Sequence, residues 1–422
     1  MFPSVSDFDP ALSPARLRSA ARNLSLAALV GALAGTASAG FLLTLDHVTA
    51  VRFSNGWLLA FLPLAGVLAA FVYRRVGDRA EGGANLILDE IHTPGGGVPL
   101  RMAPLVLGAT LLTHLCGGSA GREGTAVQMG GALAGGVRKL LRIDLAQQGM
   151  LLSAGVAGGF GAVFGTPLAG AVFAVEVLTR GRLSHAWLGT CLLAALVGDQ
   201  VCHAWGVRHD DYGALANLDA LPSTLAVMPL LQATALGLCC GYVARGFIAL
   251  AHGAGRLPLP PAKAWWMRPA LGGITILLLA LALRTDAYLG LGASNPDPGV
   301  PTLLSVWIEG GATPWSWFWK LVFTALTVGA GFKGGEVTPL FFIGAAFGHV
   351  AGPLLGLPLP LGVALGFVAV FAGASKTPLA CTLLAVEIFG GDHSELFAVA
   401  CLASYLASGA GGIYSAQRQA AP

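Results

Sequence analysis

The sequence contains Gly165-Thr-Pro-Leu-Ala-Gly-Ala-Val-Phe-Ala-Val-Glu-Val177 and, further along, Lys376-Thr-Pro-Leu-Ala-Cys-Thr-Leu-Leu-Ala-Val-Glu-Ile388. The Thr-Pro pairs of these two stretches, at 166 and 377, are 211 positions apart. A second pair of stretches, 121–135 and 334–348, aligns at an offset of 213. Nearly equal offsets indicate two homologous halves.

Composition places these halves in lipid. Hydrophobic residues make up 55% of the 422, and charged residues only 11%. A water-soluble fold cannot accommodate so apolar a chain. Apolar stretches long enough to span or deeply enter a bilayer recur from about Leu24 to Ala407, which predicts an all-α polytopic membrane protein of roughly a dozen or more helices. Duplicated halves are a recurrent transporter design, in which the substrate binds where the repeats meet.

Basic residues indicate the topology. They cluster in the first 23 residues, in three later loops and near the C-terminus: Arg16, Arg18 and Arg22; Arg74, Arg75 and Arg79; Arg138, Lys139 and Arg142; Arg180 and Arg182; Arg418. The positive-inside rule therefore predicts that both termini are cytoplasmic in a multi-pass protein of the plasma (inner) membrane. We expect a cytoplasmic N-terminal helix in 1–23, a first membrane repeat in 24–206, a linker in 207–222, a second repeat in 223–409 and a cytoplasmic tail in 410–422, all within one integral membrane domain.

Several function classes lack support. No basic run is interleaved with aromatic residues, so the net charge of +3 gives no nucleic-acid signal. Seven cysteines lack metal-ligand spacing and the nine histidines form no H-E-x-x-H motif, so neither a metal site nor a cofactor is expected. The segment 117–121 matches the G-x-S-x-G pattern around Ser119, with His114 as a candidate base, but that motif requires a preceding strand and the segment here is apolar and helical. We do not expect the protein to be an enzyme. An intramembrane serine hydrolase stays as the alternative, and labelling of Ser119 by a serine-reactive probe would test it.

Glycines break two apolar stretches just before a carboxylate. Segments 117–121 and 329–335 each interrupt a span and precede Glu123 or Glu336, which correspond under the repeat. Broken helices at membrane depth are tolerated where they line a cavity or are buried in protein. Other glycines, at 131, 135, 344 and 348, have the small-residue spacing that allows close helix packing in lipid.

A carboxylate at the start of a membrane helix has a specific chemical meaning. Free backbone amides and the positive end of the helix dipole attract anions, so a tethered carboxylate can occupy the site of a free anion. Protonation of Glu123 would remove this competitor and link proton binding to anion binding. The alternative is a simple helix cap. For Glu336, which we expect to handle protons, the alternative is neutralisation by Lys333. We expect Glu176 and Glu387, which close the repeated stretches, to be structural.

Three further polar residues are candidates for the ion path. Asn85 opens an amphipathic stretch and could donate its side-chain amide to an anion, or simply cap that helix. Thr338 lies three residues into the second glycine-initiated segment, where its hydroxyl can donate. Tyr414 follows the final span, where it could also serve as an interfacial anchor.

These motifs together resemble the CLC family of anion channels and transporters. Gly121-Arg-Glu-Gly-Thr125 resembles its gating-glutamate signature, Gly335-Glu-Val-Thr-Pro339 its second-half pore motif, and Gly412-Ile-Tyr-Ser415 its terminal tyrosine element. The resemblance covers about Leu24 to Ser415. It implies two inverted repeats with broken and re-entrant helices, a homodimer with one pathway per subunit, and no cofactor.

The departures from the family pattern resemble its fluoride/proton antiporter branch. Ala84-Asn-Leu-Ile-Leu88 replaces the Gly-Ser-Gly-Ile-Pro motif of chloride transporters, and we match Asn85 to the missing serine. The internal proton-transfer glutamate of chloride/proton exchangers falls at Val177, which is apolar, so a different proton route through Glu336 is implied.

The resemblance implies a proton-coupled antiporter that exports fluoride. In this hypothesis Glu123 is the gating glutamate, and Asn85, Thr338 and the backbone amides near Gly124 and Val337 bind the ion, while Tyr414 frames its inner side. A chloride/proton exchanger and an uncoupled anion channel of the same fold stay as alternatives. The expected partners are fluoride or chloride, protons and the lipid bilayer.

Overall fold

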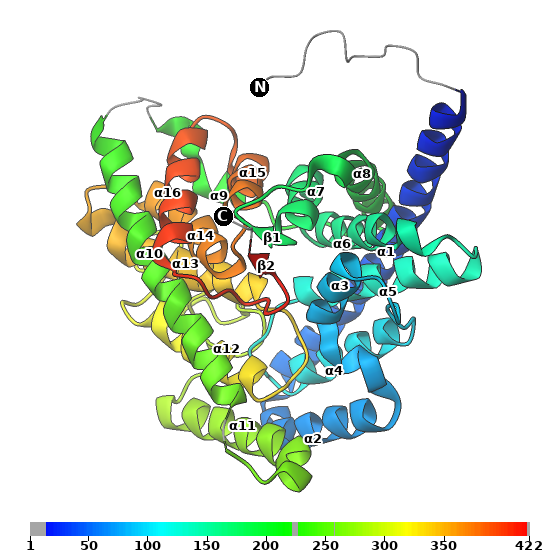
Figure 1. Cartoon of the computed structure of the whole chain (residues 1–422). Coiled ribbons are helices and arrows are strands. Elements are labelled where there is room, and N and C mark those ends of the chain that lie inside the picture. The colour runs from blue at the N-terminus through cyan, green and yellow to red at the C-terminus, as the bar shows by residue number, and fades with distance from the viewer. Residues whose placement is uncertain (1–13, 222–226, 257, 420–422) are drawn as a thin grey trace.

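The computed structural model describes residues 14–221, 227–256 and 258–419, and these form a helical protein (Figure 1). The helices of the first half are α1 (Pro14–Ser54), α2 (Leu62–Val72), α3 (Gly83–His92), α4 (Met102–Leu115), α5 (Glu123–Leu140), α6 (Gln148–Phe164), α7 (Pro167–Glu176) and α8 (Leu188–Ala204). After the short α9 (Tyr212–Ala216), the second half contains α10 (Val227–Gly255), α11 (Pro261–Leu283), α12 (Ser316–Gly329), α13 (Val337–Leu354), α14 (Leu359–Ser375), α15 (Pro378–Phe389) and α16 (Ser394–Ala407).

The predicted repeat is visible in how equivalent helices end and begin. Helix α6 ends at Gly165 (φ 71°) and α14 ends at Lys376 (φ 63°), both in the left-handed conformation that terminates helices. A Thr-Pro pair follows in each half, and proline at the first helical position starts α7 and α15. The same turn therefore forms twice, although glycine adopts it freely and lysine does so at a cost.

Two predicted boundaries differ in detail from the observed elements. Helix α1 runs without a break from Pro14 to Ser54, so residues 14–23 extend the first span and do not form a separate N-terminal helix. The segment expected as a linker, 207–222, contains α9 and a short 3₁₀ turn. Residues 1–13 of the expected N-terminal helix, residue 222 of the linker and residues 420–422 of the tail lie outside the described residues.

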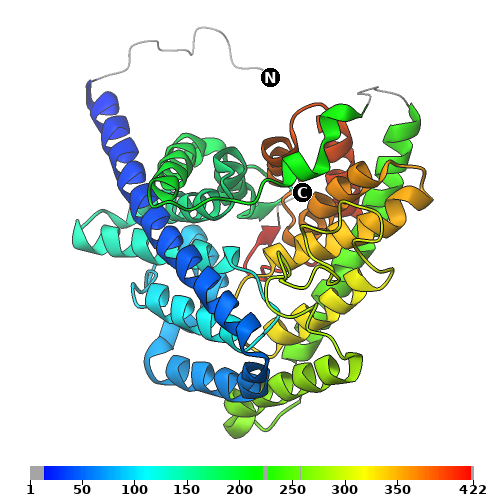
Figure 2. The ribbon, with the colours of Figure 1, turned by 180° about the vertical axis from the view of Figure 1, so that it is seen from behind.

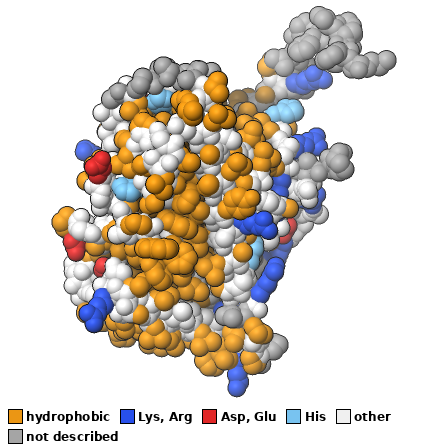
Figure 3. Space-filling model, turned by 90° about the vertical axis from the view of Figure 1, so that its left-hand side faces the viewer, with side chains coloured by type: hydrophobic (Ala, Val, Ile, Leu, Met, Phe, Trp, Pro, Cys, Tyr) orange, Lys and Arg blue, Asp and Glu red, His pale blue; other side chains and the backbone are white. Residues whose placement is uncertain are grey.

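The helices have the lengths and surfaces of a membrane protein. Five described helical segments are long and apolar enough to cross a bilayer, and several apolar helices of 10–17 residues are too short to do so alone. Hydrophobic side chains cover much of the face shown in Figure 3. Large exposed hydrophobic side chains of the protein include Leu231 and Leu238 on α10. Short apolar helices beside longer spans agree with the broken and re-entrant helices that the family resemblance implies.

Glycine allows the closest helix contacts. A side-chain carbon added at Gly344 or Gly348 of α13 would lie 2.1 Å from a carbonyl oxygen of α14. In the first half the equivalent contact joins Gly130 of α5 to Gly155 of α6, also at 2.1 Å. The predicted glycines at 131 and 135 instead face the side chain of Ile87 and the backbone of Val98. The close-packing prediction is therefore correct for α13 and for Gly131, which packs against α3, while Gly130 makes a further contact with α6.

The two halves lie side by side and exchange segments at their boundary. Figure 2 shows the blue-to-green first half beside the green-to-red second half. The chain end returns to the first half, where β2 (Arg418–Gln419) pairs in parallel with β1 (Thr179–Arg180). Buried aromatic rings join the halves, including Phe173 stacked on Phe371 with centroids 6.2 Å apart.

Candidate functional site

Two unwound segments meet where the halves face each other. One connects α4 to α5 and the other connects α12 to α13. The amide of Gly335 donates to the carbonyl of Gly121 at 2.7 Å, and the reverse hydrogen bond measures 2.5 Å. A side-chain carbon at Gly124 would lie 2.9 Å from the Cα of Gly335, so glycine is required for this approach. The N-termini of α5 and α13 are thereby held together.

The Glu123 carboxylate binds at the start of α13. Its side chain is fully buried, and its Oε2 accepts a hydrogen bond from the Thr338 amide at 3.0 Å. The Thr338 hydroxyl donates to Oε1. A first-half carboxylate therefore occupies the donors of a second-half helix start, which is a binding position for anions. The alternative that Glu123 only caps its own helix does not account for these bonds.

Arg122 is a functional candidate that the sequence reasoning missed. Its amide donates to Glu123 Oε2 at 3.2 Å and its guanidinium Nε lies 3.5 Å from Oε1. The seated carboxylate therefore has a cation beside it as well as neutral donors. The signal was present, because Arg122 directly precedes Glu123 in the motif, but the direction of its side chain could not be read from the order of residues.

Two cavities are lined by residues of this site. The first, the arginine cavity, has a volume of about 160 Å³ and is lined by Arg122 together with Arg52, Arg208 and His114 among others. The second, the Glu336 cavity, has a volume of about 290 Å³ and is lined by Glu336, Asn85, His252, Ile413 and Ser415 among others. One cavity thus includes the residue before Glu123, and the other includes two of the polar candidates from the sequence.

Glu336 is not paired with Lys333 in the described part of the chain. The Lys333 ammonium lies over the ring of Tyr73, 4.5 Å from its centroid, and no ion pair joins it to Glu336 among the residues described. Glu336 is half-buried and immediately precedes α13. Its carboxyl group is therefore available to the cavity that it lines.

Asn85 lies against the chain end that carries Tyr414. Asn85 Oδ1 accepts a hydrogen bond from the Ala416 amide at 3.0 Å, which ties α3 to the chain end. This bond uses the oxygen and leaves the amide nitrogen as a donor. Tyr414 is buried and packs edge-on against Phe173, and it lies close enough to interact electrostatically with both Glu336 and Glu123. Val337, also buried, supplies backbone next to Thr338.

The other repeated glutamates form reciprocal helix caps. Glu176 accepts hydrogen bonds from the amides of Leu379 (3.0 Å) and Ala380 (2.7 Å) at the start of α15. Glu387 accepts them from the amides of Leu168 (2.8 Å) and Ala169 (2.7 Å) at the start of α7. Each half therefore caps a helix of the other half, in agreement with the structural role expected for both.

The serine-hydrolase alternative has no geometric support. The Ser119 hydroxyl is fully buried and bonds the Thr324 hydroxyl at 2.8 Å. Neither nitrogen of His114 has a hydrogen-bond partner among the described residues. Ser119 and His114 therefore form no dyad, and the preceding α4 is helical where the hydrolase motif requires a strand.

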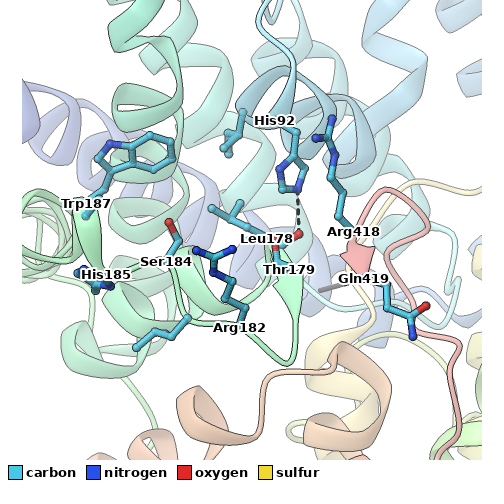
Figure 4. Close-up of a pocket in the computed structure, with 12 residues that line it drawn as sticks. His92, Leu178, Thr179, Arg182, Ser184, His185, Trp187, Arg418 and Gln419 are labelled. Carbon is cyan, nitrogen blue, oxygen red and sulfur yellow. Dashed lines mark hydrogen bonds between the residues drawn. The ribbon is translucent and has the colours of Figure 1, made fainter. Parts of the chain in front are cut away.

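A separate cavity of about 490 Å³ lies beside the β1–β2 pair (Figure 4). His92, Arg182, His185, Trp187 and Arg418 contribute side chains to its wall, and His92 Nε2 lies 2.8 Å from the Leu178 carbonyl oxygen. None of the predicted ion-path residues lines it. It is therefore distinct from the Glu123 site.

Comparisons with known proteins agree with this geometry. Residues 65–409 match the voltage gated chloride channel family. The chain is 45% identical over 406 residues to a "Chloride/fluoride channel protein" of Pseudomonas syringae pv. tomato, covering 94% of this chain and 86% of that protein. It is 28% identical to a "Putative chloride channel protein ClcB-like" of Ralstonia nicotianae, covering 87% of each.

Two solved structures show the same fold. A CLC-type fluoride/proton antiporter superposes with a TM-score of 0.87 at 32% identity, covering 97% of this chain and all of the other. A slow cyanobacterial Cl⁻/H⁺ antiporter superposes with a TM-score of 0.75 at 19% identity, covering 93% of this chain and 96% of the other. The matched family, the shared fold and the paired helix starts around Glu123 lead to one conclusion: this chain belongs to the CLC family of anion channels and transporters.

Proposed function

We propose that this CLC protein exports fluoride in exchange for protons, with Glu123 as the gate. The observation that supports this most directly is the buried Glu123 carboxylate on the amide and hydroxyl of Thr338. A transported anion needs those same donors. The carboxylate therefore competes with the ion for one position between the arginine cavity and the Glu336 cavity.

Protonation decides this competition. Hydrogen bonds to charged groups contribute about 1.5–3 kcal/mol each, and a neutral carboxyl group accepts them more weakly. A proton on Glu123 therefore weakens its hold on the Thr338 donors and frees them for an anion. The seated carboxylate and the anion exclude each other from these donors, so the two occupy them in turn as Glu123 releases and binds its proton.

The proposed path uses neutral donors for a small, strongly hydrated ion. Fluoride must exchange its water for donors that hold it firmly and still release it. Thr338, the Asn85 amide and the backbone amides at Gly124 and Val337 supply such donors. Arg122 compensates the gate charge when Glu123 is seated and attracts the anion when Glu123 withdraws.

In this proposal protons leave the gate through the Glu336 cavity. Glu336 and Asn85 line the same cavity, so fluoride enters the path on the side where the proton is released. Tyr414 lies near both carboxyl groups and frames this side of the path. Since Val177 is apolar, Glu336 is the carboxyl group that replaces the internal proton-transfer glutamate of chloride/proton exchangers.

The membrane potential provides sufficient driving force. Moving one charge across 100 mV is worth about 2.3 kcal/mol, which corresponds to a concentration ratio of about fiftyfold. Export of fluoride against proton entry moves charge in the favourable direction in a cell that is negative inside. We propose that the protein acts as a homodimer in the plasma membrane, with both termini cytoplasmic.

Chloride/proton exchange and uncoupled anion conduction are the rivals. The Pseudomonas relative is named for both chloride and fluoride and as a channel, whereas the solved neighbour is titled a fluoride/proton antiporter. A fluoride electrode and a pH electrode on the same proteoliposomes distinguish the three. Antiport predicts fluoride efflux with stoichiometric proton uptake and a much slower chloride flux.

The deciding variant is Glu123→Gln, which keeps the shape of the gate but cannot bind or release a proton. We expect proton-coupled fluoride flux to fall to background. Glu309→Gln is the matched control, because Glu309 is exposed and lines neither cavity. Coupled flux that persists in Glu123→Gln would show that the gate has been misidentified.

A further inference from the structure

Two histidines and an aspartate gather at the C-terminal end of α8. Asp199 and His203 lie one turn apart on the helix, and His209 returns to them from the segment that follows. One potential ligand atom from each of the three lies within 4.8 Å of the others. The rings of His203 and His209 are 5.3 Å apart and nearly perpendicular. Three side chains from two segments therefore converge on one point.

One polar atom in this cluster lacks a partner. His209 Nε2 is buried and has no hydrogen-bond partner in the described part of the chain. A buried polar atom left unsatisfied costs about 1–3 kcal/mol, and more if it is charged. Asp199 is only 7% exposed, and its Oδ1 pairs with His203 Nδ1 at 3.2 Å. The unpaired nitrogen and the buried carboxylate therefore offer two ligands to a cation.

The spacing suits a zinc-like ion. Zn²⁺ binds nitrogen and oxygen ligands at about 2.0–2.2 Å in a tetrahedron, which places ligand atoms about 3.3 Å apart. Asp199 Oδ1 and His203 Nδ1 are already 3.2 Å apart. A small rotation of the His209 ring completes three ligands, and the exposed side of His203 leaves the fourth position open to water.

The surroundings hold His209 in place for this role. Gly165 has a positive φ of 71°, and a side-chain carbon there would lie 2.6 Å from the His209 ring. Glycine thus makes the space that the ring occupies. Glu387 interacts electrostatically with Asp199 and adds negative charge, whereas Arg122 acts on His209 in the opposite sense. A simple Asp199–His203 ion pair would need neither this space nor His209.

We propose that Asp199, His203 and His209 form a binding site for Zn²⁺ or a similar divalent transition metal. The site lies at the far end of α8 from Arg180 and Arg182, so the predicted topology exposes it on the outer face. Arg208 and Asp210, the neighbours of His209, line the arginine cavity. A bound ion would tie this segment to α8 and slow anion passage through that cavity; this second statement rests on the proposed function.

The binding test uses the full-length protein in detergent, freed of metal with a chelator. Titration with Co²⁺ should give one site per subunit with the visible absorption of a tetrahedral ion, and Zn²⁺ should displace it. His209→Ala and Asp199→Asn should weaken binding at least about tenfold, since losing even an outer-shell partner costs a metal site 10- to 100-fold. His185→Ala, an exposed histidine on another surface, should bind normally.

Thermal unfolding guards against a variant that simply fails to fold. Zn²⁺ should raise the melting temperature of the native protein and of His185→Ala but not that of His209→Ala, whose metal-free melting should match the native value. Absence of saturable one-to-one binding, or equal binding by His209→Ala, would overturn the site.

The transport test adds Zn²⁺ outside proteoliposomes during fluoride efflux. We expect efflux to slow several-fold in the native protein and to be unaffected in His209→Ala. Binding without slowing would overturn the link to the arginine cavity and leave the metal site standing. If the protein moved no fluoride at all, the result would count against the proposed function. The Co²⁺ titration would still test the metal site, because it does not depend on transport.

Discussion

Replacing Thr338 by valine tests the competition at the gate. Valine has nearly the shape of threonine but lacks the hydroxyl that donates to Glu123 Oε1, while the backbone donor at 3.0 Å remains. The change therefore removes one of two second-half donors from the seated, ionised carboxylate. The protonated and withdrawn state of Glu123 does not need that donor, so the balance shifts towards it.

The magnitude follows from the bond that is lost. A hydrogen bond to a charged group is worth about 1.5–3 kcal/mol, and 1.36 kcal/mol corresponds to a tenfold change in the proton concentration required. With the ionised state less stable, fewer protons are needed to unseat the carboxylate. The midpoint of the pH dependence of fluoride efflux should therefore move to higher pH by about one to two units.

The assay measures fluoride efflux from proteoliposomes over a range of pH, equal on both sides, with Thr338→Ser as the matched control. Serine keeps the hydroxyl, so its midpoint should stay near the native value. The midpoint is more informative than the maximal rate, because fluoride itself uses the Thr338 donor and the rate could fall for that reason. A midpoint in Thr338→Val that is unchanged, or shifted to lower pH, would refute the competition model.

Three further changes test the caps, the packing and the ion path. Glu387→Gln should lower stability by about 1–3 kcal/mol, because it replaces a charged cap of α7. Thermal unfolding in detergent should report this loss, while Glu309→Gln, at an exposed position, should have little effect. Gly344→Ala should reduce the yield of folded protein, since the added carbon would meet the Gly366 carbonyl oxygen at 2.1 Å; size-exclusion chromatography of detergent extracts would detect the loss, and a normal profile would contradict the contact. Asn85→Asp keeps the acceptor for the chain end but adds a negative charge, so fluoride efflux should slow at least about tenfold with unchanged melting.

Local sequence patterns were sufficient to predict much of the fold. Composition and apolar stretches predicted the membrane helices, and the recurrence of Thr-Pro turns at 166 and 377 predicted two halves that the helices bear out. Close packing at Gly344 and Gly348 was also predicted, because small-residue spacing is a property of a single helix. The further contact of Gly130 with α6 was not predicted, since it depends on how α5 is rotated against α6.

The order of residues along the chain did not reveal the proposed metal site. Asp199 and His203 have the one-turn spacing of a helical ligand pair, but His209 lies beyond the helix end and its return depends on the space at Gly165. No metal motif contains this spacing, so the sequence predicted none. Arg122 was missed for a related reason, because the direction of its side chain depends on the unwound backbone before α5.

The sequence by itself determined that this is a duplicated membrane protein of the CLC type, and that Glu123 and Glu336 begin equivalent helices. Tertiary structure alone decided that the partner of Glu123 is Thr338 of the other half, and that Glu176 and Glu387 cap each other's repeats. The physical reason is the distance along the chain over which each kind of interaction acts. Helix periodicity, turn chemistry and hydropathy act over a few neighbouring residues, whereas a carboxylate in a water-free interior must find donors wherever the packed halves present them.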